Sequence, residues 1–117
     1  MQTETKASVD QISDGNGGRV TVLRFSGDIS SNSHDALLGT YTTVSKSLPV
    51  LLDFSKVEYI NSSGIALVIQ MLIEAANSGQ KVFAYGLSPH FTKVFTMVGI
   101  TKYAGLFPDQ AAAVAAL

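Results

Sequence analysis

Two adjacent hydroxyl groups lie at the point where one apolar run of the sequence ends and another begins. Segment 59–69 has the sequence YINSSGIALVI, with Asn61, Ser62, Ser63 and Gly64 between the apolar parts. This pattern predicts a strand that leads into a buried helix. A helix N-terminus leaves up to four N–H groups unpaired and carries about half a positive charge. Asn61 and Ser62 are both competent capping residues. Gly64 either permits close approach of a neighbouring backbone or keeps the helix start uncluttered.

The same geometry would tolerate a phosphate on Ser62. A phosphate adds about −1.5 to −2 charge and three acceptor oxygens, which free N–H groups and the helix dipole accommodate. The chain has a net charge of only −1, so this charge would dominate the surrounding surface. A partner that buries Ser62 would then meet an unpaired dianion. Helix capping alone also explains the segment, so the two interpretations stand side by side here.

The helix expected over 63–77 is apolar on nearly all sides and carries one charge, Glu74. Only one face of a helix can pack fully on a sheet. Two candidate stripes follow from the spacing, and the one that does not face the sheet is either covered by the next helix or exposed to a partner. The stripes are Ala66, Ile69, Ile73 and Ala76, and Ile65, Val68, Leu72 and Ala75.

The remaining pattern predicts a single α/β domain with strands alternating with helices. A β-hairpin is expected from strands at 8–12 and 19–25 around the turn SDGNGG, followed by a loop at 26–33. Alternation then implies a mixed, mostly parallel sheet, with about four helices mainly on one face. The polar segment 1–7 is expected to be disordered and 8–117 to form the domain. The further strands are expected at 50–55, 81–86 and 102–107, and the helices at 34–47 (capped by Ser33), 63–77, 88–99 and 108–117.

Composition argues against several classes of function. The chain has no cysteine, no apolar leader after Met1 and no apolar run long enough to cross a membrane. Its near-neutral charge gives no sign of nucleic-acid binding. We therefore expect a cytoplasmic protein with neither nucleic-acid binding nor direct membrane insertion.

No arrangement of side chains suggests catalysis. His34 and His90 lack a second ligand at metal-like spacing, and Asp53 stands alone in a buried strand. The glycine-rich segment DGNGG lies between two strands, so it is a turn rather than a phosphate loop. We expect no enzyme activity, no metal site and no cofactor.

Three ordered motifs resemble those of STAS domains, the family that includes the anti-sigma factor antagonists. VLLDFSKVEYINSSGIALVI (50–69) is similar to the family signature of an apolar strand followed by a serine-glycine helix start. RVTVLRFSGDIS (19–30) resembles the first long strand and its loop. GQKVFAYGLSPHFTKVFTMVGI (79–100) resembles the next strand, helix start and terminal turn. The likeness extends over residues 8–116 and implies the family's small mixed sheet.

The resemblance also implies a mechanism. In the antagonists, the serine at the position of Ser62 is phosphorylated by a kinase that is also an anti-sigma factor, and a serine phosphatase reverses the reaction. Ser62 is thus the expected phosphorylation site, with Ser63 as second choice. Unmodified antagonist binds the kinase and frees the sigma factor. The residues expected to contact partners are Asp28, Ser30, Asn61, Ser62, Ser63, Gly64, Ile65 and Val68.

Two positions depart from the family pattern and keep alternatives open. Asn61 stands where antagonists commonly have aspartate, and Ser30 matches a second common acid. These changes favour, as an alternative, a STAS scaffold without serine chemistry or a subunit of a larger signalling or transport assembly. A small-ligand or nucleotide sensor that uses loops 27–33 and 61–64 is a third hypothesis. The sequence is also compatible with a dimer.

Overall fold

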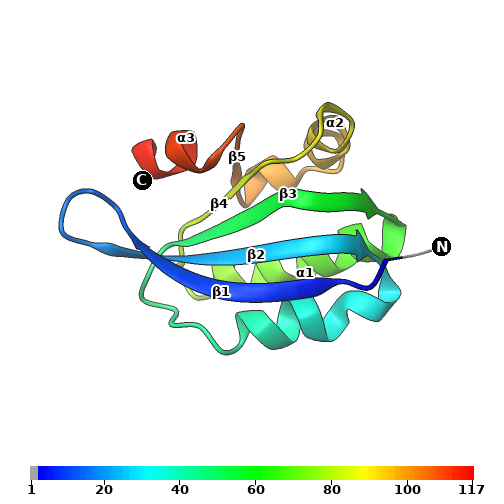
Figure 1. Cartoon of the computed structure of the whole chain (residues 1–117), viewed down its shortest axis with the longest axis horizontal. Helices are drawn as coiled ribbons and strands as arrows, with labels where there is room; N and C mark the ends of the chain where they lie inside the picture. Colours follow the sequence, from blue (N-terminus) through cyan, green and yellow to red (C-terminus); the bar gives the residue numbers. More distant parts are fainter. Residues whose placement is uncertain (1–2) are drawn as a thin grey trace.

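A computed structural model describes residues 3–117 of the chain, and five strands and several helices make up its fold (Figure 1). The strands are β1 (Lys6–Ser13), β2 (Arg19–Ile29), β3 (Val50–Ile60), β4 (Val82–Tyr85) and β5 (Gly105–Phe107). The α-helices are α1 (Ser62–Asn77), α2 (Pro89–Met97) and α3 (Gln110–Ala115). Shorter helical turns are η1 (Ser31–Ser33), η2 (Asp35–Gly39, a π-helix) and η3 (Ile100–Lys102).

The strands form one sheet in the order β1-β2-β3-β4-β5. β1 and β2 pair antiparallel, and all the other neighbours pair parallel. The turn of the hairpin is built by Asp14, whose Oδ1 accepts hydrogen bonds from the N–H groups of Asn16 (2.7 Å) and Gly18 (2.9 Å). This mixed, mostly parallel sheet with an N-terminal hairpin confirms the predicted fold class.

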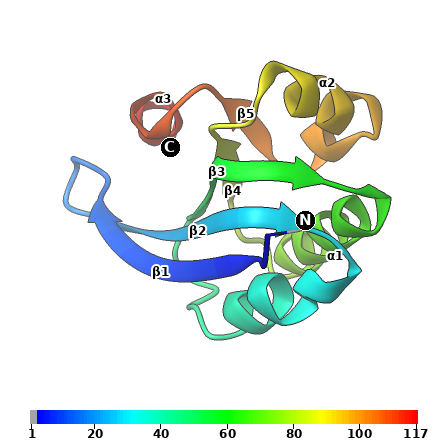
Figure 2. The same ribbon diagram turned by 45° about the vertical axis from the view of Figure 1, so that its right-hand side comes forward.

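Figure 2 shows α1 and the helical segment 31–41 side by side on one side of the sheet. The larger core lies on that face, where Leu52 and Phe54 of β3 meet Val68 and Leu72 of α1. α2 adds Phe91 and Phe95 to the same core, and the Phe95 ring meets the Phe54 ring edge-on. On the opposite face, α3 covers a smaller cluster, which consists of Val20, Val22, Leu51, Tyr85 and Ala113.

Several predicted boundaries are wrong, and the largest error concerns the helix predicted over 34–47. Helical structure runs from 31 to 41 instead, and Ser30 rather than Ser33 is its N-cap. The hydroxyls of Thr42 and Thr43 donate to the carbonyl oxygens of Gly39 and Thr40 (2.7 Å each). Such side-chain bonds compete with helix continuation, which explains the early end.

Strands β2 and β3 are longer than predicted. Each continues through the polar residues that follow its predicted C-terminal end. β2 extends to Ile29 through two irregularities in its pairing with β3, and Gly27 adopts a positive φ of 83° there. β3 extends to Ile60, so 56–60 belongs to the sheet. Toward the C-terminus, η3 occupies the start of the strand predicted over 102–107, which begins only at Gly105.

Part of the N-terminal segment lies beside the end of β2 in this structure, and the disorder expected over 1–7 stays a prediction. β1 begins at Lys6, and Thr3 and Asp28 are joined by a backbone bond from the Asp28 N–H to the Thr3 carbonyl (3.1 Å). The Thr5 hydroxyl donates to the carbonyl of Asp28 (2.5 Å) and contacts the hydroxyl of Ser33. Residues 1–2 of the predicted segment lie outside the described residues.

Candidate functional site

The junction between β3 and α1 is held by Asn61. Its side-chain oxygen accepts a hydrogen bond from the N–H of Gly64 (2.8 Å), and its own N–H donates to the carbonyl of Ile29 (3.1 Å). One residue therefore caps α1 and fixes the helix start to the end of β2. The sequence left both Asn61 and Ser62 as possible caps, and the structure assigns the cap to Asn61.

Gly64 is buried where α1 approaches the end of β2. A Cβ atom added at this position would lie 2.7 Å from the carbonyl carbon of Ile29 and 2.9 Å from its Cγ2. Both distances are well below ordinary van der Waals contact. The expectation that Gly64 permits close backbone approach is confirmed, and no larger residue fits without displacing one of the two elements.

Ser62 and Ser63 occupy the first turn of α1 and are both exposed. Because Asn61 caps the helix, the Ser62 hydroxyl is not needed for that purpose, and it has no hydrogen-bond partner among residues 3–117. The first turn carries no acidic residue. The site thus combines an accessible hydroxyl with the positive end of a four-turn helix, an environment that favours added negative charge.

An exposed apolar stripe runs along α1 from Ser62. Residues at i, i+4, i+7 and i+11 share one helix face, so Ala66, Ile69 and Ile73 follow Ser62 in line. Ala66 and Ile73 are exposed, Ile73 by 40%, and Ile69 is half-buried. We call Ala66, Ile69, Ile73 and Ala76 the α1 stripe. It is the stripe that faces solvent, which answers a question that the sequence left open.

The opposite stripe of α1 forms the core, and this corrects one expected partner contact. Val68 is fully buried between α1 and the sheet, together with Leu72 and Ala75. A partner cannot reach Val68 in this conformation, so its assignment as a contact residue is wrong. Ile65 is half-buried beside the same core. Spacing alone identifies two stripes but cannot say which one the sheet covers.

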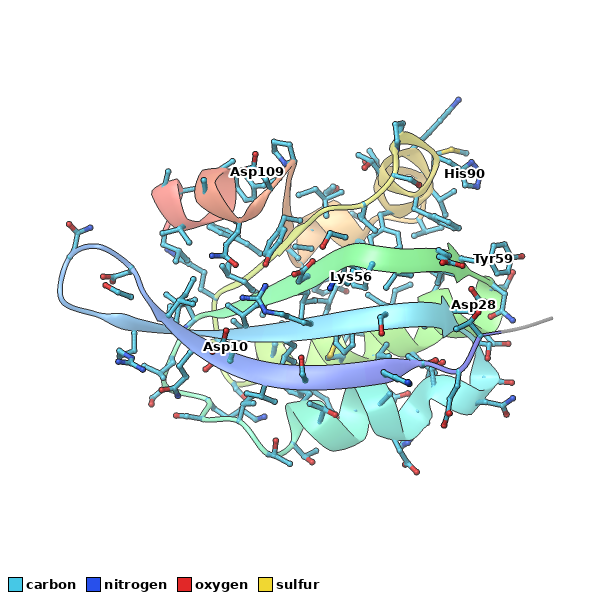
Figure 3. All side chains as sticks on the ribbon, in the orientation of Figure 1. Asp10, Asp28, Lys56, Tyr59, His90 and Asp109 are labelled. Atoms are coloured by element: carbon cyan, nitrogen blue, oxygen red, sulfur yellow. The ribbon has the colours of Figure 1, made fainter. Side chains whose placement is uncertain are left out.

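Asp28 and Ser30 lie near the same end of the sheet but are engaged elsewhere. Asp28 is opposite Tyr59 in the β2–β3 ladder (Figure 3), and its carboxylate accepts the Thr3 N–H (3.2 Å). Ser30 is 5% exposed, and its hydroxyl accepts the Asn32 N–H (3.3 Å). Both line an open cavity of about 390 Å³, whose lining includes none of residues 61–64.

Sequence reasoning missed Tyr59, which is 54% exposed at the end of β3. Its ring packs edge-on against Phe91 of α2, with ring centroids 6.1 Å apart, and the His90 ring also packs edge-on against Phe91 at 4.8 Å. Tyr59 and His90 lie at the same end of the molecule, where β3 ends (Figure 3). A large aromatic residue next to polar Glu58 at a strand end was the available signal.

Asp53, the isolated acid of the buried strand, belongs to a structural network on the opposite face of the sheet. Its carboxylate accepts hydrogen bonds from the Arg24 guanidinium (2.9 Å) and from both the N–H (2.9 Å) and the hydroxyl (2.5 Å) of Ser55. Burial by itself raises the pKa of Asp53, but these hydrogen bonds outweigh burial, so its pKa lies below the ordinary value. Burial and the nearby Asp53 charge raise the pKa of Tyr85 to about 12.

Within residues 3–117, no group of three or more metal-ligating side chains is placed to hold a metal ion. Over the same residues, every helix is too short or too polar to cross a membrane.

Comparison with known families decides the affiliation. A family model described as "Mlab, STAS domain" matches residues 12–108, which is most of the chain. The chain belongs to the STAS-domain family. The match spans β2 to β5 and includes the Asn61–Gly64 segment. No curated protein sequence matches this STAS chain.

Solved structures with the same fold include several anti-sigma factor antagonists. One from Mycobacterium paratuberculosis has a TM-score of 0.75 at 17% identity, covering 97% of this chain and 93% of that one. Phosphorylated SpoIIAA, a Bacillus cell-fate determinant, has a TM-score of 0.67 at 16% identity, with 95% and 99% covered. The murine anion transporter Slc26a9 has a TM-score of 0.74 at 12% identity, but only 22% of that longer chain is covered. At these identities the likeness concerns the fold.

Proposed function

We propose that this STAS domain is an anti-sigma factor antagonist that is switched off by phosphorylation of Ser62. The unmodified domain binds an anti-sigma factor with serine kinase activity in the cytoplasm. Transfer of a phosphate to Ser62 releases that partner, and a serine phosphatase restores binding. The observation that carries the proposal is the alignment of an exposed, uncommitted Ser62 hydroxyl with the solvent-facing α1 stripe.

Physical chemistry links this alignment to a switch. The α1 stripe provides apolar area that a partner can bury, and Ser62 lies at its N-terminal end. A phosphate of about −2 charge there would be hydrogen-bonded by the free first-turn N–H groups, so the fold tolerates it. A partner that covers the stripe would have to desolvate that charge, which costs several kcal/mol by order of magnitude. Modification therefore abolishes docking and leaves the domain folded.

Similarity to the antagonist structures supports the class of partner. The solved proteins include SpoIIAA in phosphorylated and unphosphorylated forms. In this chain, Asn61 keeps the cap that positions Ser62, although it lacks the negative charge common in antagonists. Residues Tyr59, Ser63 and Ile65 would complete the contact surface around Ser62.

The test is incubation of the chain with a co-encoded serine kinase and ATP, followed by intact-mass measurement. We expect one added phosphate, which is lost in Ser62→Ala and retained in Ser63→Ala. Capture of the kinase by unmodified chain, and its release after modification, completes the test. Transfer of the phosphate to Ser63 instead would contradict the assignment.

A scaffold without serine chemistry remains the alternative, because Asn61 alters the family pattern and the transporter domain shares this fold. It predicts that Ser62→Ala and Ser62→Asp bind every partner as the unaltered chain does. Lack of phosphate incorporation with any kinase of the same cell would favour this alternative.

A further inference from the structure

Within residues 3–117, β1 has a neighbouring strand on one side only. β1 is the terminal strand of the sheet (Figure 1), and none of the other described residues pairs with its outer side. It has eight residues, contains no proline and pairs with β2 in unbroken register. Long, regular edges of this kind are templates for strand pairing. The opposite edge, β5, has only three residues.

The register identifies the backbone groups that point outward. The Thr21 N–H donates to the carbonyl of Pro49, toward β3, so alternate residues such as Val22 and Arg24 direct their groups toward β1. Their partners Asp10 and Ser8 therefore bond with β2. It follows that Ala7, Val9 and Gln11 turn their N–H and C=O groups outward. In agreement, the Gln11 N–H is bonded only to the carboxylate of its neighbour Asp10 (2.9 Å).

The side chains of β1 leave this edge approachable from both faces. Lys6, Ser8 and Asp10 alternate along the face that carries Arg24, away from the larger core, and all three are exposed. Val9 points to the opposite, helix-bearing side and is 47% exposed. The helical layer thus does not cover the middle of β1.

We propose that β1 pairs antiparallel with β1 of a second copy of the chain, about a two-fold axis at Ser8. This register places Lys6 opposite Asp10 of the second copy, and by symmetry it does so twice. Ala7 then lies opposite Val9 of the second copy, and their outward groups form the ladder. The two five-stranded sheets become one continuous sheet.

The charges of Lys6 and Asp10 favour this register over the registers in which the two-fold axis lies one residue away. An axis at Val9 would place Lys6 opposite Ile12, and an axis at Ala7 would place it opposite Ser8, so each forfeits both ion pairs. Charged residues on an edge strand commonly prevent pairing. Here, however, the two charges have opposite sign and are equally distant from Ser8. Each Asp10 carboxylate, which also pairs with Arg24 of its own chain (3.4 Å), therefore attracts Lys6 across the axis. Exposed ion pairs contribute modestly, and the contact is small, so the dimer is weak and concentration-dependent.

A single cysteine tests the axis, because the chain has no cysteine of its own. At the axis, opposing residues form a non-hydrogen-bonded pair with Cα atoms about 4.5 Å apart, within disulfide range. We expect Ser8→Cys to form a disulfide-linked dimer with a mild oxidant. The matched control Ser13→Cys, exposed on the same strand but far from the axis, should stay monomeric. Equal cross-linking of both variants, or none in Ser8→Cys despite a reagent-accessible thiol, would overturn the proposal.

Sedimentation equilibrium of the cysteine-free chain tests the charge selection. Lys6→Glu should weaken association by about tenfold, since two attractive pairs become repulsive. The double variant Lys6→Glu/Asp10→Lys, which exchanges the two charges, should restore it. A native chain that is monomeric at millimolar concentration, or a double variant as weak as the single one, contradicts this arrangement.

Discussion

The backbone of Gly64 lies directly against the carbonyl of Ile29, so the start of α1 and the end of β2 share one contact with no room for a side chain. The neighbouring Asn61 N–H bonds the same carbonyl oxygen. The position of the Ser62 hydroxyl therefore depends on two backbone interactions with a strand more than thirty residues away in sequence.

Replacement of Gly64 by alanine should destabilise the domain by about 1–3 kcal/mol, because the new methyl group overpacks the contact with Ile29. Alanine is the better helix former by about 1 kcal/mol, so any gain from propensity opposes this loss. Urea unfolding followed by circular dichroism measures the difference. The exposed control Ser63→Ala should stay within about 0.5 kcal/mol of the native chain. A Gly64→Ala variant as stable as the native chain would show that β2 and α1 separate easily.

Replacement of Asn61 by alanine should lower the free energy of unfolding by about 1 kcal/mol, since the Gly64 N–H loses its acceptor. Asn61→Asp keeps an acceptor and adds a negative charge at the positive end of α1, so it should be as stable as the native chain or slightly more stable. Thermal and urea unfolding of the pair measure the cap. If both variants lost the same stability, the amide N–H donors of Asn61, rather than its oxygen, would be responsible.

Replacement of Ser62 by aspartate should leave the fold intact and weaken capture of the kinase partner. An acid suits the first turn of a helix, while its charge disfavours burial of the α1 stripe. Circular dichroism and a pull-down report the two effects separately. Ser63→Asp adds the same charge one residue away from the stripe and should weaken binding less. An unfolded Ser62→Asp protein would contradict the proposed tolerance of charge at this site.

Replacement of Asp53 by asparagine should cost about 1–3 kcal/mol at pH 7, because Arg24 and Ser55 lose a charged acceptor. The folded-state pKa of Asp53 lies below its ordinary value. The stabilisation is thus complete above the ordinary value of about 4 and is lost as the pH falls through the lower folded value. Urea midpoints of the two proteins should differ at pH 7, begin to converge below about pH 4 and meet once the pH is below the folded-state pKa. A difference that persists at low pH would indicate lost packing instead of lost charge.

Local patterns determined the order of elements in this chain. β-branched runs such as RVTVLRF specify strands, Ser88 and Pro89 start α2 as predicted, and the Asn61–Gly64 segment marks a helix start. Alternation of strands and helices was enough to predict the mixed sheet, because parallel neighbours require crossover helices. Each of these signals lies within a few residues, which is the range over which propensity and capping act.

The tertiary structure decided which surfaces those elements present. The spacing in α1 gave two equivalent apolar stripes, and only packing on the sheet buried Val68 and exposed Ile73. β2 continues through Gly27 to Ile29 because the neighbouring strand and the N-terminal segment pair with it. Asn61 rather than Ser62 is the N-cap of α1, because its N–H is bonded to the Ile29 carbonyl at the end of β2 and this contact fixes the helix start. Contacts between residues distant in sequence set burial and accessibility. The sequence therefore predicts a hydroxyl at Ser62, but only the tertiary structure shows that this hydroxyl is exposed and not used as the helix cap.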